Sequence, residues 1–336
     1  MKSKLVKKFK GGSLSSTNLM SNLKDELFVR KDVSLKSDRE YGFQRWYSQL
    51  KRLQRYSVLF PDLFPKVLNF GKKDNFAYFD MEYIENSVNA HDFIETCKDD
   101  KVLDNFFEEL LRILSILHDK KIKSNPEAIE LYIFEEIDQR IKDCLGNKNF
   151  TDFIKYNEFY FNGHLVDSFL NSYDEYKDML IECYSGQYET FTHGNITLEN
   201  IMYVPDQNRI ILIDPYEENV VDSVLAEYSQ LLQSTNSHYE IYNKSYAKVE
   251  KNKILLNITK PYGITYINNK LLNFISENYS KKEYFAIRLL EVSQFIRMLP
   301  FKMAVDENKM IFFYGLASHL FHNIKKEYKT FKTNKI

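Results

Sequence analysis

The sequence predicts an α+β protein with a small β-rich N-terminal part and a larger helical part behind it. Short apolar and β-branched segments, which are typical of strands, gather in the first 85 of the 336 residues. Beyond about residue 90, long segments have the apolar content and spacing of helices, most clearly over 283–298 and 307–326. We therefore expect two domains, residues 1–85 with a sheet and one helix, and residues 86–336, which are mainly helical.

The composition limits the class of protein. Lys and Arg number 46 and Asp and Glu 47, so the net charge of −1 gives no overall excess for binding nucleic acid, and the basic stretches 2–10 and 325–335 are terminal. Three separated cysteines without a Cys-x-x-Cys pair indicate neither a disulfide framework nor a zinc site. The charged N-terminus is followed by no apolar run, and no apolar segment approaches the ~18 residues of a membrane span. These features predict a cytoplasmic protein without a membrane span.

The N-terminal part is expected to form a mixed sheet of about five strands with one helix across it. The helix is predicted from Arg39 to before Pro61, because its apolar residues from Phe43 to Leu53 are spaced to share one face. A turn over residues 11–18 is expected to close the first strand. The predicted strands are Leu5–Phe9, Glu26–Lys31, Val67–Gly71 and Phe76–Ile84.

The C-terminal part is predicted to contain helices around one strand hairpin. The segment 106–118 is apolar all round and is expected to be a buried helix, and 126–185 is expected to hold two or three helices. The hairpin covers 201–214, with its turn at Pro205-Asp206-Gln207-Asn208. The remaining candidates are a helix over 225–233, strands over 253–258 and 264–267, and helices over 283–298 and 307–326.

Residues 193–214 carry the residues with the clearest chemistry. A polar loop, His193-Gly194-Asn195 to Asn200, precedes the hairpin, whose second apolar strand ends at Asp214. This order brings Asn200 and Asp214 to one end of the hairpin. An amide oxygen and a carboxylate are hard ligands suited to Mg²⁺ that carries a nucleotide phosphate.

This arrangement resembles the catalytic loop and metal hairpin of the protein-kinase-like phosphotransferases, in the branch of aminoglycoside phosphotransferases and choline kinases. That branch reads His-Gly-Asp, four residues, Asn, and later an Ile-Asp pair. The resemblance covers most of residues 5–240. It implies a two-lobed fold with a β-rich N-lobe and a helical C-lobe, ATP or GTP with Mg²⁺ as cofactors, and Asn200 and Asp214 as metal ligands. It also implies that His193 packs and hydrogen-bonds the catalytic loop.

Several N-terminal residues fall where this family places its nucleotide contacts. Gly11-Gly12-Ser13 resembles the turn that covers the phosphates, although such a triplet alone is also an ordinary turn. Lys31 resembles the lysine that pairs with the α- and β-phosphates, and Glu40 in the next helix is the residue that would hold it by an ion pair. Arg30 is the alternative base, because strand alternation turns it to the opposite face.

Two further segments extend the resemblance. Met81, Glu82 and Tyr83 lie in a stretch similar to the linker whose backbone groups hydrogen-bond adenine. The stretch 228–234, with Tyr239-Glu240 after it, resembles phosphotransferase-like proteins of bacterial surface-polysaccharide loci. His118 closes the helix 106–118 and is expected to be a packed structural histidine.

The sequence departs from the family at Asn195, which stands where the catalytic Asp is expected. Asn accepts a hydrogen bond through its amide oxygen but cannot take a proton at physiological pH. A general base typically contributes ~10²–10⁴-fold to a rate, whereas phosphoryl transfer depends mainly on positioning and charge neutralisation. Glu199 and Asp222 are carboxylates nearby in the sequence, but no geometric argument assigns either as a substitute base.

Three functions fit these residues. The first is a small-molecule kinase that transfers a phosphoryl group to a hydroxyl of a sugar or amino alcohol, in cell-surface polysaccharide metabolism by the finer resemblance. The second is a pseudokinase that uses the nucleotide as a structural or regulatory ligand. The third is a scaffold that has lost the nucleotide site, and the retention of both Asn200 and Asp214 argues against it. The expected partners are a nucleotide and a small-molecule acceptor.

Overall fold

The computed structural model describes residues 3–9, 15–35, 39–125, 127–184, 188–217 and 219–333, apart from the side chains of 39–42 and 45. By internal contacts the chain divides into two compact units. Unit 1 consists of Met1–Phe93, Glu108–Leu114 and His193–Asn219, and unit 2 consists of Ile94–Phe107, Ser115–Thr192 and Val220–Ile336. Helices α2 (Ala90–Thr96) and α3 (Asp100–Leu117) contribute residues to both units.

Unit 1 is built on an antiparallel sheet. Its strands follow the order β1-β2-β3-β5-β4, and every neighbouring pair runs antiparallel, so the expectation of a mixed sheet is wrong. Short connections join β2 to β3 and β4 to β5. The helix that follows β3 instead links it to β4, which lies beyond β5 in the sheet and runs in the same direction as β3 without pairing with it. The strands are β1 Lys4–Phe9, β2 Ser15–Ser21, β3 Leu27–Ser34, β4 Val67–Lys73 and β5 Phe76–Glu82.

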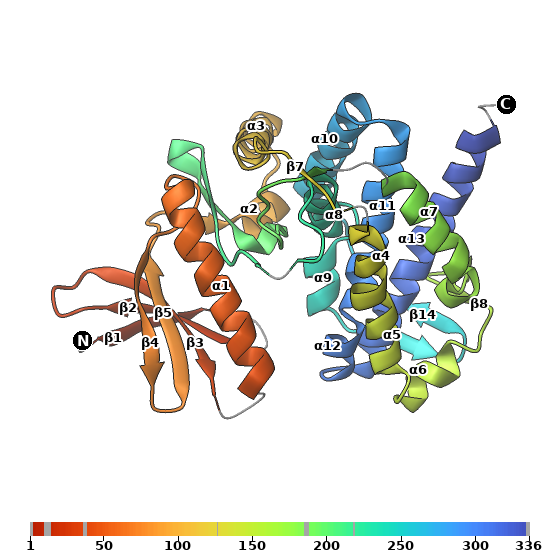
Figure 1. Ribbon diagram of the computed structural model, residues 1–336, viewed down its shortest axis with the longest axis horizontal. Coiled ribbons are helices and arrows are strands. Elements are labelled where there is room, and N and C mark those ends of the chain that lie inside the picture. Colours follow the sequence, from red (N-terminus) through yellow and green to blue (C-terminus); the bar gives the residue numbers. More distant parts are fainter. Residues whose placement is uncertain are drawn as a thin grey trace. The chain divides into compact units, whose positions relative to one another are not determined.

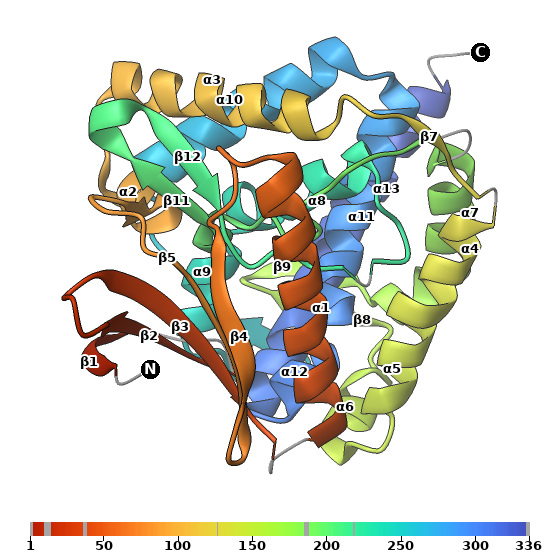
Figure 2. The ribbon, with the colours of Figure 1, turned by 60° about the vertical axis from the view of Figure 1, so that its left-hand side comes forward.

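Helix α1 (Arg39–Leu59) lies along this sheet, as the orange ribbon in Figures 1 and 2 shows. The predicted helix is confirmed, and Trp46, Leu50 and Leu53 of its apolar face are buried. The rings of Trp46 and Phe79 approach to 6.5 Å between centroids, which places α1 on the face of β5 that carries Phe79. Tyr47 is instead 44% exposed, so it flanks the packed face.

Strand β2 was not predicted from the sequence, which favoured a turn through Asn18. Its residues Ser15–Ser21 are mostly polar and lack the apolar alternation that signals a strand. The strand pairs with β1 on one side and with β3 on the other. Side chains add to the pairing with β3, since Ser16 and Asn18 both donate to the carboxylate of Asp32, at 2.5 and 3.1 Å. Pairing with a neighbouring strand therefore outweighs the local sequence preference.

The predicted hairpin is confirmed and belongs to unit 1. Strands β11 (Ile201–Val204) and β12 (Arg209–Leu212) pair antiparallel, and β6 (Val88–Asn89) adds to β11. A short 3₁₀ turn, Pro205–Gln207, joins them, and Asn208 takes a left-handed conformation with φ +46°. Asn tolerates this conformation well, which explains its place at the turn.

Unit 2 is mainly helical and contains two small hairpins. Helix α11 contacts α7, α8 and α13, and a capping box between Ser280 and Glu283 fixes its N-terminus. No helix in the described ranges has the length and apolar character needed to cross a membrane. The helices, several of them labelled in Figure 1, are α4 Ala128–Ile133, continued by a π-helix Phe134–Asp138 and α5 Gln139–Cys144, then α6 Lys148–Phe153, α7 Tyr173–Tyr184, α8 Val224–Thr235, α9 Tyr239–Lys244, α10 Tyr262–Asn278, α11 Lys281–Arg297, α12 Leu299–Met303 and α13 Glu307–Thr333.

The strands of unit 2 only partly match the prediction. The candidate strand over 264–267 is wrong, because these residues begin α10, whose buried Ile264, Ile267, Leu271 and Ile275 form a helical stripe. The candidate over 253–258 is confirmed in part. The strands are β7 Ile122–Lys123 with β10 Tyr188–Glu189, and β8 Glu158–Phe161, β9 His164–Asp167, β13 Lys248–Glu250 and β14 Lys253–Leu255 in one sheet.

The cysteines test the packing of unit 2. Burial raises the pKa of the Cys144 thiol to about 12 and that of Cys183 to about 11, whereas Cys97 is partly exposed. Only the thiolate reacts, so at pH 8 a thiol reagent should modify Cys97 first and reach the other two only in denaturant. Mass spectrometry of timed samples measures this order, and equal modification of all three in the native protein would contradict the packing.

Candidate functional site

An ion pair between Lys31 and Asp214 forms the centre of the candidate site. Lys31 lies in β3 opposite Phe79, on the face of the sheet that α1 covers, and Asp214 follows the end of β12. Lys31 Nζ lies 2.7 Å from Asp214 Oδ1, and the two side chains are 7% and 26% exposed. A nearly buried ammonium requires a counter-charge, and Asp214 provides one while staying accessible to a ligand.

Arg30, the alternative base, lies on the opposite face of the sheet. Its guanidinium binds Asp80 through two hydrogen bonds of 2.7 and 2.8 Å and lies over the ring of Tyr78, 4.4 Å from the centroid. The hydrogen bond with Asp80 raises the pKa of Arg30 above its usual value. Between the two bases that the sequence left open, Lys31 is the one beside Asp214.

His193 joins the predicted catalytic loop to the end of the hairpin. Its Nε2 lies 2.7 Å from the carbonyl oxygen of Ile213, and its Nδ1 accepts the backbone N–H of Asn195 at 3.3 Å. These partners assign the tautomer with the proton on Nε2. The ring is fully buried and stacks against Phe64. Both nitrogens are therefore used to hold the loop.

Asn200 has an amide whose orientation is fixed by the same loop. Its Nδ2 donates to the carbonyl oxygen of Asn195 at 2.8 Å, and its own backbone oxygen accepts the N–H of Ile213 at 3.0 Å. Oδ1 makes no hydrogen bond to any residue in the described ranges, although the residue is only 8% exposed. The Asn200 amide oxygen is held in this way in the same unit as the Asp214 carboxylate. Oxygen ligands of these two kinds fit a hard divalent cation.

The backbone at Asp214 is strained. Its φ is +57°, in the left-handed region that non-glycine residues seldom adopt. Hydrogen bonds on either side hold it there: Ile213 pairs with the loop, and the N–H of Tyr216 donates to the carbonyl oxygen of His193 at 2.9 Å. Strain that the surrounding contacts enforce is frequent at ligand sites.

Arg52 of α1 is an anchor that sequence reasoning missed. It is 2% exposed and its Nε donates to Glu217 Oε2 at 2.7 Å, while Nη2 reaches the Glu217 carbonyl oxygen at 3.3 Å. Arg55 binds the same carboxylate at 3.0 Å. Arg52 flanks the apolar stripe of its helix, so periodicity gave no sign of this contact. It ties α1 to the segment that follows Asp214.

Asn195 keeps its side chain uncommitted. It is half-buried, and within the described part of the chain only its backbone groups form hydrogen bonds. Of the two nearby carboxylates, Glu199 is exposed, and Asp222 belongs to unit 2 and accepts a hydrogen bond from Thr192. These observations assign neither carboxylate as a base.

The remaining predicted residues are distributed as follows. Gly11, Gly12 and Ser13, and the side chain of Glu40, lie outside the described residues. Met81 is buried on the Lys31 face, since it pairs with Val29. The N–H of Glu82 donates to the Lys66 carbonyl oxygen at 2.9 Å, and Tyr83 follows β5 half-buried. His118 lies in unit 2, 3.7 Å from the buried carboxylate of Glu227.

The comparisons with known proteins support the fold. No family model matches the chain, and no curated protein matches it. Among solved structures it is similar to a putative fructosamine-3-kinase from Haemophilus somnus 129PT, with a TM-score of 0.54 at 11% identity over 96% of this chain and 92% of that one. At this identity the likeness concerns the fold, which is α+β and kinase-like as the sequence predicted.

Gly194 tests the packing of the loop. Its φ is +79°, and a Cβ there would lie 2.5 Å from the Tyr216 carbonyl oxygen and 2.9 Å from Arg52 Nη1. Gly163 shares the conformation, with φ +85°, but a Cβ there would meet nothing within 4 Å. We expect Gly163→Ala to cost about 1 kcal/mol of unfolding free energy and Gly194→Ala at least about 3 kcal/mol, since overpacking adds to the strain.

Chemical denaturation followed by circular dichroism measures both variants. Equal destabilisation by the two substitutions would contradict the close packing of Gly194.

Proposed function

We propose that this protein binds a nucleotide triphosphate with Mg²⁺ and transfers a phosphoryl group to a hydroxyl of a small molecule. The observation that carries the proposal is the Lys31–Asp214 ion pair in the same unit as the fixed amide of Asn200. A kinase-like fold with these residues supports nucleotide chemistry, whereas the fold alone serves many functions.

Different side chains would bind the cation and the phosphates. The oxygens of Asp214 and Asn200 would hold the cation, and the Lys31 ammonium has three donors, so it can pair with a phosphate while keeping Asp214. The bound nucleotide and its Mg²⁺ would supply the phosphoryl group and neutralise its charge. The residues around them supply positioning, because their hydrogen bonds already fix the loop.

Asn195 would orient the acceptor rather than activate it. Its uncommitted amide oxygen can accept the hydrogen bond of a substrate hydroxyl, but the proton must leave to solvent or to another base. The expected catalyst is slow by about 10²–10⁴-fold relative to one with a carboxylate here. The same residue favours a second function, a pseudokinase that binds the nucleotide without turnover.

The acceptor is proposed from similarity alone. The neighbouring structure is described as a putative fructosamine-3-kinase, which favours a sugar derivative as the acceptor. The resemblance of 228–234 to proteins of surface-polysaccharide loci favours the same class. An acceptor screen over sugars and amino alcohols would therefore begin with ketose amines and hexoses.

Adjacent residues of β3 provide a matched test of nucleotide binding. Lys31→Met should weaken ATP binding about tenfold or more, because a charge-assisted hydrogen bond is lost. Arg30→Met should leave ATP affinity within about twofold but lower the unfolding free energy by about 2 kcal/mol, because Asp80 is left buried and unpaired. Fluorescent-nucleotide titration and denaturation measure these effects, and a larger affinity loss in the Arg30 variant would overturn the assignment.

Restoring the carboxylate tests the proposed turnover. Asn195→Asp is nearly isosteric and should raise ATP hydrolysis or phosphoryl transfer by about 10²–10⁴-fold. Phosphate release assayed in both proteins measures the change. No increase, with ATP bound by both, would favour the pseudokinase, and a loss of wild-type turnover would mean that Asn195 is itself adapted to catalysis.

A further inference from the structure

Unit 2 contains a polar cavity that the proposed function does not use. It has a volume of about 380 Å³ and lies among β8, the α8–α9 connection, the segment after β14, α11 and α13. Figure 1 labels these helices and strands. Its described lining includes Arg288, Lys260, His164, His238 and His319 but no carboxylate. Cationic and N–H groups therefore face a space large enough for a small organic molecule.

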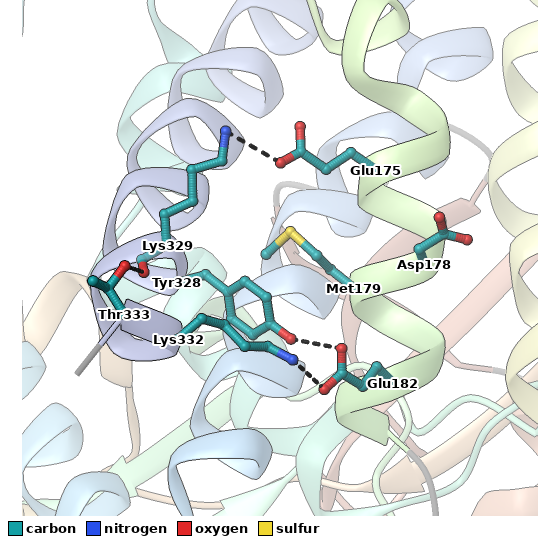
Figure 3. A pocket seen from close by; sticks show the side chains of 8 residues that line it. All are labelled: Glu175, Asp178, Met179, Glu182, Tyr328, Lys329, Lys332 and Thr333. Atoms are coloured by element: carbon teal, nitrogen blue, oxygen red, sulfur yellow. Dashed lines mark hydrogen bonds and ion pairs between the residues drawn. The ribbon is translucent and has the colours of Figure 1, made fainter. Parts of the chain in front are cut away.

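Unit 2 also contains a larger hollow, whose lining has acidic as well as basic side chains. It has about 690 Å³ and lies between α7 and α13, as Figure 3 shows. Its basic residues already have partners: Lys332 binds Glu182 at 2.6 Å and Lys329 lies 3.5 Å from Glu175. This hollow offers no surplus of donors, so the 380 Å³ cavity is the stronger candidate.

Arg288 presents donors to the cavity from a fixed position. Its Nε donates to Glu291 Oε2 at 2.9 Å and its Nη1 to the Tyr284 hydroxyl at 3.3 Å, while Nη2 has no partner in the described ranges. Glu291 is fully buried, and its Oε1 accepts hydrogen bonds from Asn236 at 2.7 Å and Ser237 at 2.5 Å. The carboxylate behind Arg288 is thus satisfied, and it orients the guanidinium.

His319 adds an unsatisfied N–H donor. Its Nε2 lies 3.2 Å from Asn323 Nδ2, which donates to it and leaves the proton on Nδ1. Nδ1 is buried and has no acceptor in the described part of the chain, and the ring stacks on Phe161 at 5.3 Å. A buried donor without an acceptor costs free energy unless a ligand supplies one.

The field at His319 is positive. Burial, together with the smaller effects of His164, His322, Lys260 and Lys326, lowers the pKa of His319 to about 4. His238, which also lines the cavity, has φ +49°, a strained conformation for a non-glycine residue. A bound anion would offset the positive charges near His319 and accept a hydrogen bond from its Nδ1–H.

We propose that this cavity binds the phosphate monoester of a small organic molecule. Arg288 Nη2, His319 Nδ1 and Lys260 offer separate donors to the terminal oxygens of a phosphate group. Ile258, Leu316 and Leu320 in the lining give an apolar wall for the organic part, and the volume exceeds the needs of inorganic phosphate. The site lies entirely in unit 2 and does not depend on the proposed nucleotide site.

Calorimetry with inorganic phosphate, glycerol 3-phosphate, glucose 6-phosphate and uncharged glycerol tests the proposal. The full chain carries Lys31→Met throughout, so that phosphate at the proposed nucleotide site contributes little. We expect saturable binding of a phosphate ester that is tighter than that of inorganic phosphate, and no binding of glycerol. Absence of saturable ester binding, or equal binding of glycerol, would overturn the proposal.

Matched variants locate the binding. His319→Phe keeps an aromatic ring against Phe161 but removes the donor, and it should weaken ester binding about tenfold or more. Lys260→Gln should weaken it severalfold, whereas Lys326→Gln removes a charge near His319 outside the lining and should change affinity less than about twofold. Unchanged binding in His319→Phe, or equal losses in both lysine variants, would overturn the proposal.

Discussion

The ion pair between Lys31 and Asp214 is the contact on which unit 1 depends. It places an ammonium that is 7% exposed against a carboxylate that is 26% exposed and joins the sheet to the end of the hairpin. Removing either partner lowers the stability of this contact, and the cost is larger when the nearly buried ammonium is the charge left unpaired. The pair therefore fixes where strand β3 meets the segment after β12.

Around this pair, some polar groups hold the loop in place and others are left to bind a ligand. His193, Arg52 and the backbone of Ile213 use their hydrogen-bonding groups to hold the loop and the strained Asp214. The amide oxygen of Asn200 and the side chain of Asn195 remain without partners in the described ranges. Polar groups that are already held in place but have no hydrogen-bond partner are suited to ligand binding. Little conformational entropy is then lost when the ligand binds.

The sequence predicted the elements that depend on local patterns. The helix α1, the hairpin and the helices over 283–298 and 307–326 were visible because their apolar spacing agrees with their structure. Strand β2 and the helical start of α10 were missed because tertiary pairing and packing decide them. The loop motif pointed to Asn200 and Asp214, whereas the Arg52–Glu217 contact spans 165 positions and left no local signal.

Isothermal titration of ATP into the protein with Mg²⁺ and with EDTA tests the central claim most directly. Three proteins are compared: the wild type, Asp214→Ala, and the control Asp206→Ala, whose side chain is exposed in the turn of the same hairpin. The account predicts affinity about tenfold or more higher with Mg²⁺ in the wild type and in Asp206→Ala, and no such difference in Asp214→Ala. Equal affinity of the wild type with Mg²⁺ and with EDTA would contradict it.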